Sequence, residues 1–319
     1  MFNPEEKKIL MALQYDLPLS QNPFVDLAHN IQLDQDLVLE TIKKFKREGV
    51  IKRIGADLNY RALKLKGKAA LVGAAVEENR IEDVARLINS INPKHNFWRE
   101  NDRFNVWFTI KARSEEEVIE DTHELMNRCG IRNYVVLPTR RVYKMDVKYD
   151  LYKGVSWSNK GVEPEEVPHV ENLGLDVKLL KQLGDLPVGE MPLKSFQEYG
   201  YSEQEIVDLI KDLIGKGIFR DFSGVLSERK IGIKENGMTV IKPGNNINRI
   251  ISQLLDNVPQ ITHLVERKII GNWEYPIYFM VHAVSKEPIE EIKDRVIQFD
   301  DVEDAKVLYS KMDLQEMGK

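Results

Sequence analysis

Apolar residues recur every three or four positions through the first fifty residues, in PEEKKILMALQ, NPFVDLAHNI and QDLVLETIKKFKREG. This spacing is typical of amphipathic helices, and the glycine that closes the third stretch is a common helix end. The following stretch, VIKRIGADLNY, has the alternation of a strand. Three helices and a small ribbon predict a winged helix-turn-helix over residues 1–66.

The next part of the chain alternates between the period of a strand and that of a helix. Strands are predicted at KAALVGAAV, HNFWRE, NVWFTIKA and NYVVLPTRRVYK, and helices at RIEDVARLINSI and SEEEVIEDTHELMNRCG. The order βαββαβ is ferredoxin-like. We therefore expect a ferredoxin-like domain over residues 67–149.

The second half of the chain repeats the first. A His–Arg pair at His95 and Arg99 recurs at His263 and Arg267, an offset of 168 positions. Farther on, VWFTIK and IYFMVH match at an offset of 171, so KIIGNWEYP contains a three-residue insertion. One gap over half a chain indicates a duplicated, fused unit and not a solenoid, whose period is much shorter.

The repeat predicts an α+β fold made of a tandem duplication. We expect a linker over 150–172, a second winged helix-turn-helix over 173–230 and a second ferredoxin-like domain over 231–319. The two sheets should pack face to face as a pseudo-dimer within the chain, with a pocket between them.

Composition narrows the class of protein. The net charge is −5, which does not suggest a generally basic nucleic-acid binder. The single cysteine, Cys129, excludes an internal disulfide framework and fits a reducing cytoplasm. The N-terminus does not resemble a signal peptide, and no apolar run approaches the roughly 20 residues of a membrane span. We expect a cytoplasmic protein without a membrane partner.

A winged helix followed by a ferredoxin-like domain resembles the Lrp/AsnC family of transcription regulators. Both predicted recognition helices nevertheless begin with carboxylates: Asp34, Asp36 and Glu40 in the first half, and Glu203, Glu205 and Asp208 in the second. Carboxylates there would face the DNA phosphates without releasing counterions. We predict no specific DNA binding and expect this part to serve in assembly.

The repeated His–Arg spacing places both side chains on one face of a strand, because side chains alternate between faces. If the next strand is antiparallel, a neighbouring row is formed by Tyr278, Met280 and His282, with Trp273 and Tyr275 at the turn. Such a surface suits a large, flat, anionic ligand. Aromatic rings supply walls, Arg binds carboxylates in bidentate fashion, and His can ligate iron or donate a proton.

The run His263, Arg267, Trp273, Tyr275–Pro276, His282 resembles the siroheme decarboxylase family, in which His-Cys-Tyr-x-Arg, Trp-Pro-Tyr-Asn and Ile-His follow one another. The segment 137–151 also resembles the closing segment of that family. The first half departs from the pattern, since Lys111 stands where the second half has His282. In the second half, Leu-Val replaces Cys-Tyr after the first histidine.

The resemblance implies a carbon–carbon lyase that removes CO2 from two acetate side chains of siroheme. The product, didecarboxysiroheme, feeds heme or dioxo-heme biosynthesis. Because no net oxidation occurs, no further cofactor is expected, and the iron belongs to the tetrapyrrole substrate. The family often uses two related subunits, so a paralogous subunit or a further homo-oligomer is a candidate partner.

The candidate residues follow from the charge and the chemistry of this substrate. The cations expected to hold its carboxylates are Arg99, Arg140, Arg141, Lys144 and Arg267, with Trp273 and Tyr275 as walls. The candidate proton donors are His263, His95, His282 and Tyr278. His263 or His95 could instead be an axial ligand of the substrate iron, and no dedicated metal site is expected. Which half holds the working site stays open.

Two other functions remain as alternatives. One is an Lrp/AsnC-type transcription regulator that binds a small effector, and the other is a non-catalytic tetrapyrrole sensor. DNA binding in a gel shift would identify the first. The mass of the tetrapyrrole after incubation distinguishes an enzyme, which removes CO2, from a sensor, which does not.

Overall fold

The computed structural model describes residues 2–63, 67–100 and 103–316, and it divides the chain into two compact units. The first unit contains Met1–Lys64, Asp146–Ser158 and Pro164–Lys234. The second contains Leu65–Met145, Asn159–Glu163 and Glu235–Lys319. Both halves of the sequence therefore contribute to both units.

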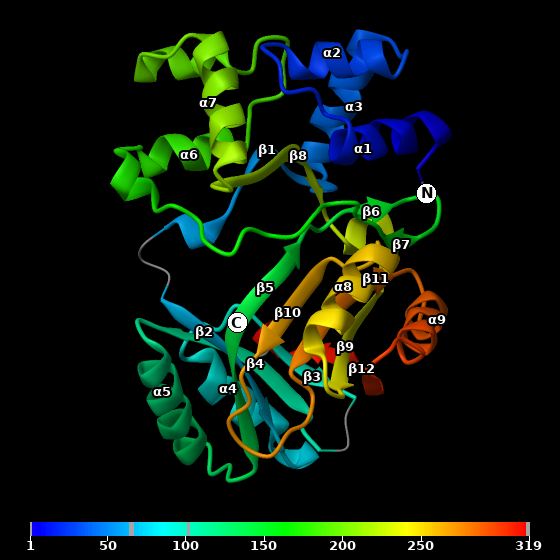
Figure 1. Ribbon diagram of the computed structural model, residues 1–319. Coiled ribbons are helices and arrows are strands. Elements are labelled where there is room, and N and C mark those ends of the chain that lie inside the picture. The colour runs from blue at the N-terminus through cyan, green and yellow to red at the C-terminus, as the bar shows by residue number, and fades with distance from the viewer. Residues whose placement is uncertain (1, 64–66, 101–102, 317–319) are drawn as a thin grey trace. The chain divides into compact units, whose positions relative to one another are not determined.

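The first unit begins with the predicted helices: α1 (Pro4–Tyr15), α2 (Pro23–Asn30) and α3 (Gln35–Arg47), followed by strand β1 (Ile51–Leu58) (Figure 1). The side chain of Asn3 accepts a hydrogen bond from the backbone N–H of Glu6, and the Glu6 side chain accepts one from Asn3. This capping box and the proline at the first turn fix the start of α1. Asp34 caps α3 by accepting from the Leu37 N–H at 2.9 Å.

The second half adds α6 (Val177–Leu183), a 3-10 helix (Lys194–Tyr199), α7 (Glu203–Gly215) and β8 (Phe219–Leu226). Where an α-helix was expected at MPLKSFQEYG, the chain makes the tighter 3-10 turn, which ends at Gly200 with φ 82°. The predicted ribbon is shared between the halves, because β1 pairs antiparallel with β8. Gly55 in β1 is required there, since a Cβ atom would lie 2.2 Å from the carbonyl oxygen of Leu183.

The first part of the predicted linker is folded into the first unit. Together with Tyr149, the last residue of the predicted ferredoxin-like domain, it forms the short strands β6 (Tyr149–Asp150) and β7 (Val155–Ser156), which pair antiparallel. Tyr149 is buried in the core that α1, α3 and α7 share. Its backbone exchanges two hydrogen bonds with the Gln14 side chain, at 3.1 and 2.9 Å. This segment therefore contributes to the core of the unit in addition to joining the halves.

The second unit contains two βαββαβ sets. The first is β2 (Lys68–Ala74), α4 (Ile81–Asn89), β3 (Asn96–Arg99), β4 (Val106–Ala112), α5 (Glu115–Arg128) and β5 (Tyr134–Met145). The second is β9 (Glu235–Pro243), α8 (Ile247–Asn257), β10 (His263–Arg267), β11 (Ile277–Ala283), α9 (Glu287–Val296) and β12 (Val302–Asp313). Their strand orders, β5-β2-β4-β3 and β12-β9-β11-β10, are the same.

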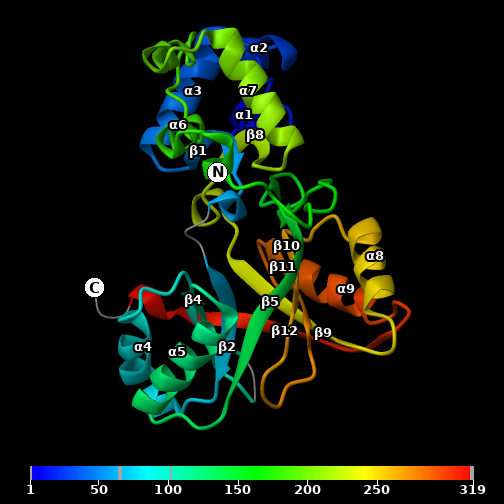
Figure 2. The same ribbon diagram turned by 60° about the vertical axis from the view of Figure 1, so that its left-hand side comes forward.

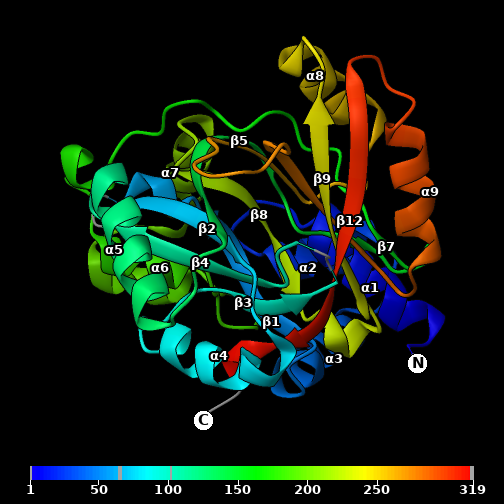
Figure 3. The same ribbon diagram turned by 90° about the horizontal axis from the view of Figure 1, so that it is seen from below.

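The two sheets of this unit join at both edges. β3 pairs with β12, and β5 pairs with β10, so the strands close into an antiparallel barrel β10-β5-β2-β4-β3-β12-β9-β11 (Figure 2). Helices α4 and α5 cover one side, and α8 and α9 cover the other (Figure 3). The sheets thus face each other as predicted, and hydrogen bonds at their edges also join them.

Large apolar and aromatic side chains fill part of the barrel. This cluster, the aromatic plug, contains Leu71, Phe104, Trp107, Val135, Leu137, Met238, Val240, Trp273, Tyr275, Tyr278 and Leu308. Gly73 makes room for it, because a Cβ atom there would lie 2.8 Å from the indole of Trp107. Among the described residues, no helix is long and apolar enough to cross a membrane.

Candidate functional site

The pairing of β10 with β11 brings the predicted rows together. His263 lies opposite Met280, and Val265 lies opposite Tyr278. Directly paired residues point to the same side of a sheet, and Tyr278 belongs to the aromatic plug. His263, Val265 and Arg267 therefore face the interior of the barrel, as do Tyr278, Met280 and His282.

Two imidazoles meet on this inward face. The rings of His263 and His282 have centroids 6.4 Å apart. His282 is buried and His263 is half-buried. Thr262 Oγ1 lies 2.9 Å from Nδ1 of His263. This contact orients the His263 ring.

Arg267 ends the same row. Its Nη1 donates to the carbonyl of Leu137 at 3.2 Å and to Thr139 Oγ1 at 3.3 Å, and its guanidinium lies over the ring of Tyr278 at 5.3 Å. Within the described residues it forms no ion pair, and its Nε makes no hydrogen bond. Burial lowers the pKa of Arg267 to about 10, so it remains a cation at neutral pH.

The loop that contains the insertion supports Tyr278. Trp273 Nε1 donates to Tyr278 Oη at 2.7 Å and to the carbonyl of Tyr275 at 3.1 Å. Burial raises the pKa of Tyr278 above its ordinary value, and Arg267 partly offsets this effect. The hydroxyl of Tyr278 therefore stays protonated at neutral pH.

Of the equivalent pair in the first half, Arg99 ends β3, on the opposite wall of the barrel, and His95 directly precedes that strand. His95 is exposed and stacks on Phe97, with ring centroids 6.0 Å apart. Arg99 is buried, donates from Nη1 to the carbonyl of Leu308 at 2.8 Å, and lies over the Phe97 ring at 5.2 Å. Burial lowers the pKa of Arg99 to about 10.

The three basic candidates on β5 lie apart from this row. The register shifts twice along the β5–β10 pairing, and it sets Arg141 opposite Glu266 and Lys144 opposite Leu264. Glu266 and Leu264 alternate with His263 and Arg267, so Arg141 and Lys144 share the other face of the sheet. The predicted substrate cations Arg141 and Lys144 are therefore not brought to the histidine pair.

Arg140 forms an ion pair with Glu266, a residue that the sequence analysis did not single out. Its Nη1 lies 2.9 Å from Oε1 of the buried Glu266, and Tyr143 donates to the other oxygen at 2.8 Å. Burial, together with the hydrogen bond to Glu266, raises the pKa of Tyr143 to about 12. The available signal was a carboxylate two residues after Leu264, and so on the same face of the predicted strand.

A pocket of about 740 Å³ opens beside Arg99. It is lined by residues from both halves, among them Trp98, Arg99, Trp273, Tyr275 and Lys311. The two aromatic wall candidates, Trp273 and Tyr275, thus contact the plug and also line this pocket.

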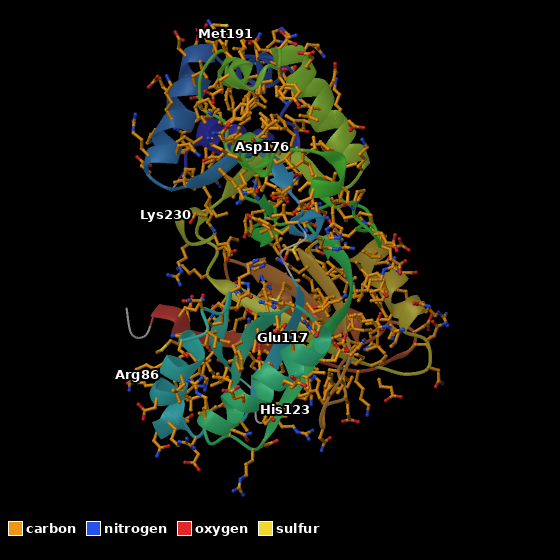
Figure 4. All side chains as sticks on the ribbon, turned by 90° about the vertical axis from the view of Figure 1, so that its left-hand side faces the viewer. Arg86, Glu117, His123, Asp176, Met191 and Lys230 are labelled. Atoms are coloured by element: carbon orange, nitrogen blue, oxygen red, sulfur yellow. The ribbon has the colours of Figure 1, made fainter. Side chains whose placement is uncertain are left out.

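The remaining histidines offer no metal site of the usual kind. His123 lies on α5, in the outer helical layer, where its ring contacts the hydroxyl of Tyr134 (Figure 4). In the described part of the chain, no group of three or more His, Cys, Asp or Glu side chains could hold a metal ion.

Known proteins share both units. Residues 67–144 and 230–315 match the family described as AsnC-like ligand binding domain, and residues 6–52 match the siroheme decarboxylase NirDL-like HTH domain. A siroheme decarboxylase of Hydrogenobacter thermophilus is 28% identical over 300 residues, which cover 92% of this chain and 87% of the relative. The siroheme decarboxylase beta subunit of Methanosarcina barkeri is 32% identical over 145 residues, covering 45% of this chain and 95% of that subunit.

A solved structure shares the fold over nearly the whole chain. The crystal structure of the siroheme decarboxylase NirDL superposes with a TM-score of 0.62 at 24% identity, covering 97% of this chain and 92% of that one. The same protein is also known in co-complex with an iron-uroporphyrin III analogue.

The fold and the matched domains define an AsnC-like ligand-binding protein that carries a helix-turn-helix unit. Within that class, the chain belongs to the siroheme decarboxylase family, as the similarity to the Methanosarcina subunit shows.

Proposed function

We propose that this chain removes CO2 from two acetate side chains of siroheme and forms didecarboxysiroheme. The observation that supports this most is the inward face of β10 and β11, where His263, His282, Tyr278 and Arg267 share one surface. This surface combines proton donors with the Arg267 guanidinium, which forms no ion pair with the described residues.

Decarboxylation breaks the bond between the acetate methylene carbon and the carboxylate carbon. CO2 leaves, and the electron pair stays on the methylene carbon, where the macrocycle delocalises it. A proton must then be added to that carbon. No electrons are gained or lost overall, so the proposed reaction needs no cofactor beyond the iron that the substrate carries.

The proton donor is best sought among the histidines. An imidazole has an ordinary pKa near neutrality, so it can give up a proton and regain one from water. Tyr278 is held neutral by its raised pKa and is the poorer acid. We therefore assign protonation to His263 or His282. The other of the two is a candidate axial ligand of the substrate iron.

Arg267 is assigned to a substrate carboxylate. Its Nη1 is occupied by Leu137 and Thr139, whereas its Nε makes no hydrogen bond among the described residues. The edge formed by Nε and the second Nη can receive a carboxylate with two parallel hydrogen bonds. An ion pair there would also offset the desolvation of a buried guanidinium.

The tandem organisation gives the two halves different tasks. In this proposal, both halves derive from one duplicated unit, and the second half has kept the reacting histidines, His263 and His282. In the first half Lys111 replaces the counterpart of His282. The candidates Arg140, Arg141 and Lys144 then support the barrel wall around Glu266. A further copy or a paralogous subunit remains a candidate partner, and the cytoplasm is the proposed location.

The helix-turn-helix unit is proposed to act in assembly without specific DNA binding. Asp34 caps α3, and Ser202 with Glu205 forms a capping box at α7, at 3.3 and 2.7 Å. These side chains occupy the N–H groups that would otherwise contact phosphates.

The deciding experiment is an anaerobic assay of the purified chain with reconstituted siroheme, followed by mass analysis of the tetrapyrrole. Loss of two CO2 is expected. Binding with an unchanged mass would favour the non-catalytic sensor, and specific retention of DNA in a gel shift would favour the regulator.

A further inference from the structure

The pocket beside Arg99 contains a buried cation with few partners. Arg99 is 5% exposed, and one of its nitrogens donates to the carbonyl of Leu308. Its Nε makes no hydrogen bond, and within the described residues the guanidinium forms no ion pair. A buried charge without a counter-charge is unfavourable, so an anion that entered the pocket would be strongly favoured there.

Three of the four carboxylates that line this pocket form ion pairs with lysines. Glu274 pairs with Lys242 at 2.9 Å, and Glu290 pairs with Lys293 at 3.0 Å. Glu100 pairs more loosely with Lys286, at 3.4 Å. Glu78 also lines the pocket, and none of the four carboxylates forms an ion pair with Arg99 among the described residues.

Lys311 adds a second positive charge at this place. Its Nζ lies over the ring of Trp98, 5.2 Å from the centroid, and it forms no ion pair with the described residues. Trp98 lies on the face of β3 that packs against the helices, with Lys311 over its ring, whereas Trp273 and Tyr275 provide flat apolar walls on the inward side, where Arg99 lies. Aromatic walls with cations between them suit a planar ring that carries carboxylates.

The two halves differ at the equivalent positions. The connection Lys268–Pro276, which contains the insertion, places Trp273 and Tyr275 in the Arg99 pocket, whereas the shorter connection Glu100–Asn105 has no such insertion. At Arg267 the guanidinium instead turns to Thr139 and the Tyr278 ring. The insertion thus contributes Trp273 and Tyr275 to the walls beside Arg99.

We propose that this pocket is a second binding site, for a planar aromatic polycarboxylate, in which Arg99 and Lys311 hold carboxylates and Trp273 and Tyr275 contact the ring. That the ligand is a tetrapyrrole rests on the proposed function. The volume of about 740 Å³ lies within the roughly 300–1,000 Å³ of small-molecule sites. Arg99 is on the wall opposite β10, and neither His263 nor His282 lines this pocket.

The test uses iron-free uroporphyrin III, which carries carboxylates and has no metal for a histidine to ligate. It is titrated against the full chain and its binding is measured by equilibrium dialysis. Loss of a charge-assisted pair in Arg99→Gln should weaken binding to this pocket about 10- to 100-fold. Lys311→Gln, whose side chain is exposed, should weaken it by about 2- to 5-fold without a risk to folding.

Two controls separate this site from other effects. Arg267→Gln makes the same chemical change in the other half, and binding that depends on Arg99 should survive it. Lys153→Gln removes another lysine that lies over a tryptophan, Trp157, at 3.6 Å in the first unit. This variant should bind like the wild type.

The outcomes also separate this proposal from the proposed reaction. If Arg99→Gln and Lys311→Gln bind uroporphyrin like the wild type, the second site is wrong, even if siroheme is decarboxylated. If Arg99→Gln fails to fold, Lys311→Gln alone decides. Porphyrin binding that depends on Lys311, in a chain that releases no CO2, would support the site and contradict the reaction.

Discussion

Trp273 Nε1 donates a hydrogen bond to Tyr278 Oη at 2.7 Å, across the turn that contains the insertion. The phenol ring in turn lies under the guanidinium of Arg267 at 5.3 Å. The insertion therefore supplies the donor that fixes the tyrosine on which Arg267 rests.

Removing that donor should destabilise the barrel and slow the reaction. Trp273→Phe leaves the buried hydroxyl of Tyr278 without this partner, which costs about 1–3 kcal/mol in the free energy of unfolding. Denaturant unfolding measures this loss. The double variant with Tyr278→Phe should recover part of it, since the orphaned hydroxyl is then gone. Strictly additive effects would show that the two residues do not interact.

Arg267→Lys should slow decarboxylation by about ten- to a hundredfold in kcat/KM, which corresponds to about 1.5–3 kcal/mol. Lysine keeps the charge but has no planar fork to hold a carboxylate with two hydrogen bonds. Melting temperature and the iron spectrum should stay near the wild type. Wild-type rates would move the working site to the first half, around His95 and Arg99. A variant that unfolds would indicate that Arg267 only supports the sheet.

Binding of siroheme or of an iron porphyrin should shift the Soret band. The basis is the His263–His282 pair on the inward face. If one of the two ligates the iron, its replacement by alanine removes the shift while the other variant keeps it. The exposed His95 provides the comparison in the first half. A spectrum that is unchanged in all three variants would exclude these histidines as axial ligands.

Specific DNA binding is not expected at moderate salt. Carboxylates at the starts of α3 and α7 cap their own helices and would repel phosphates. Footprinting and gel shifts with competitor DNA measure this directly. A footprint that survives about 0.2 M salt and exceeds binding to random DNA would overturn the expectation.

Alkaline pH should weaken the wall formed by β5 and β10. Burial and the Glu266 hydrogen bond raise the pKa of Tyr143 from 10.0 to about 12 in the folded chain. The folded state therefore holds a proton that the unfolded state has lost between pH 10 and 12. Stability from this group is complete below pH 10 and is lost as pH rises towards 12. The ionisation of Tyr143 can be followed as the tyrosinate absorbance that is lost in Tyr143→Phe. In Glu266→Gln this ionisation should occur at lower pH, and an unchanged titration would contradict the assignment.

Local alternation was enough to predict the two inward rows. His263, Val265 and Arg267 share a face because side chains alternate along any regular strand, and β10 and β11 are regular over this stretch. The order of elements in each half was predicted for the same reason, since every helix and strand of the second unit carries its own periodic pattern.

The register of β5 could not be predicted in this way. Its two shifts against β10 turn Arg141 and Lys144 to the other face, and a bulge depends on the partner strand. The shared ribbon of β1 and β8 and the closure of the barrel likewise depend on pairing between residues far apart in sequence. The 3-10 helix Lys194–Tyr199 differs from an α-helix in its hydrogen bonding and its tighter winding, which composition does not reveal.

The closure of the barrel at both edges has a consequence for a divided chain. If the halves were expressed as separate polypeptides, β3, β5, β10 and β12 would each expose an unsatisfied row of backbone donors and acceptors, which promotes aggregation. Their folding would then depend on protein concentration, as in an obligate heterodimer. Because the two halves are part of one chain, each is present at a high effective concentration near the other. The barrel therefore assembles even when the protein is scarce.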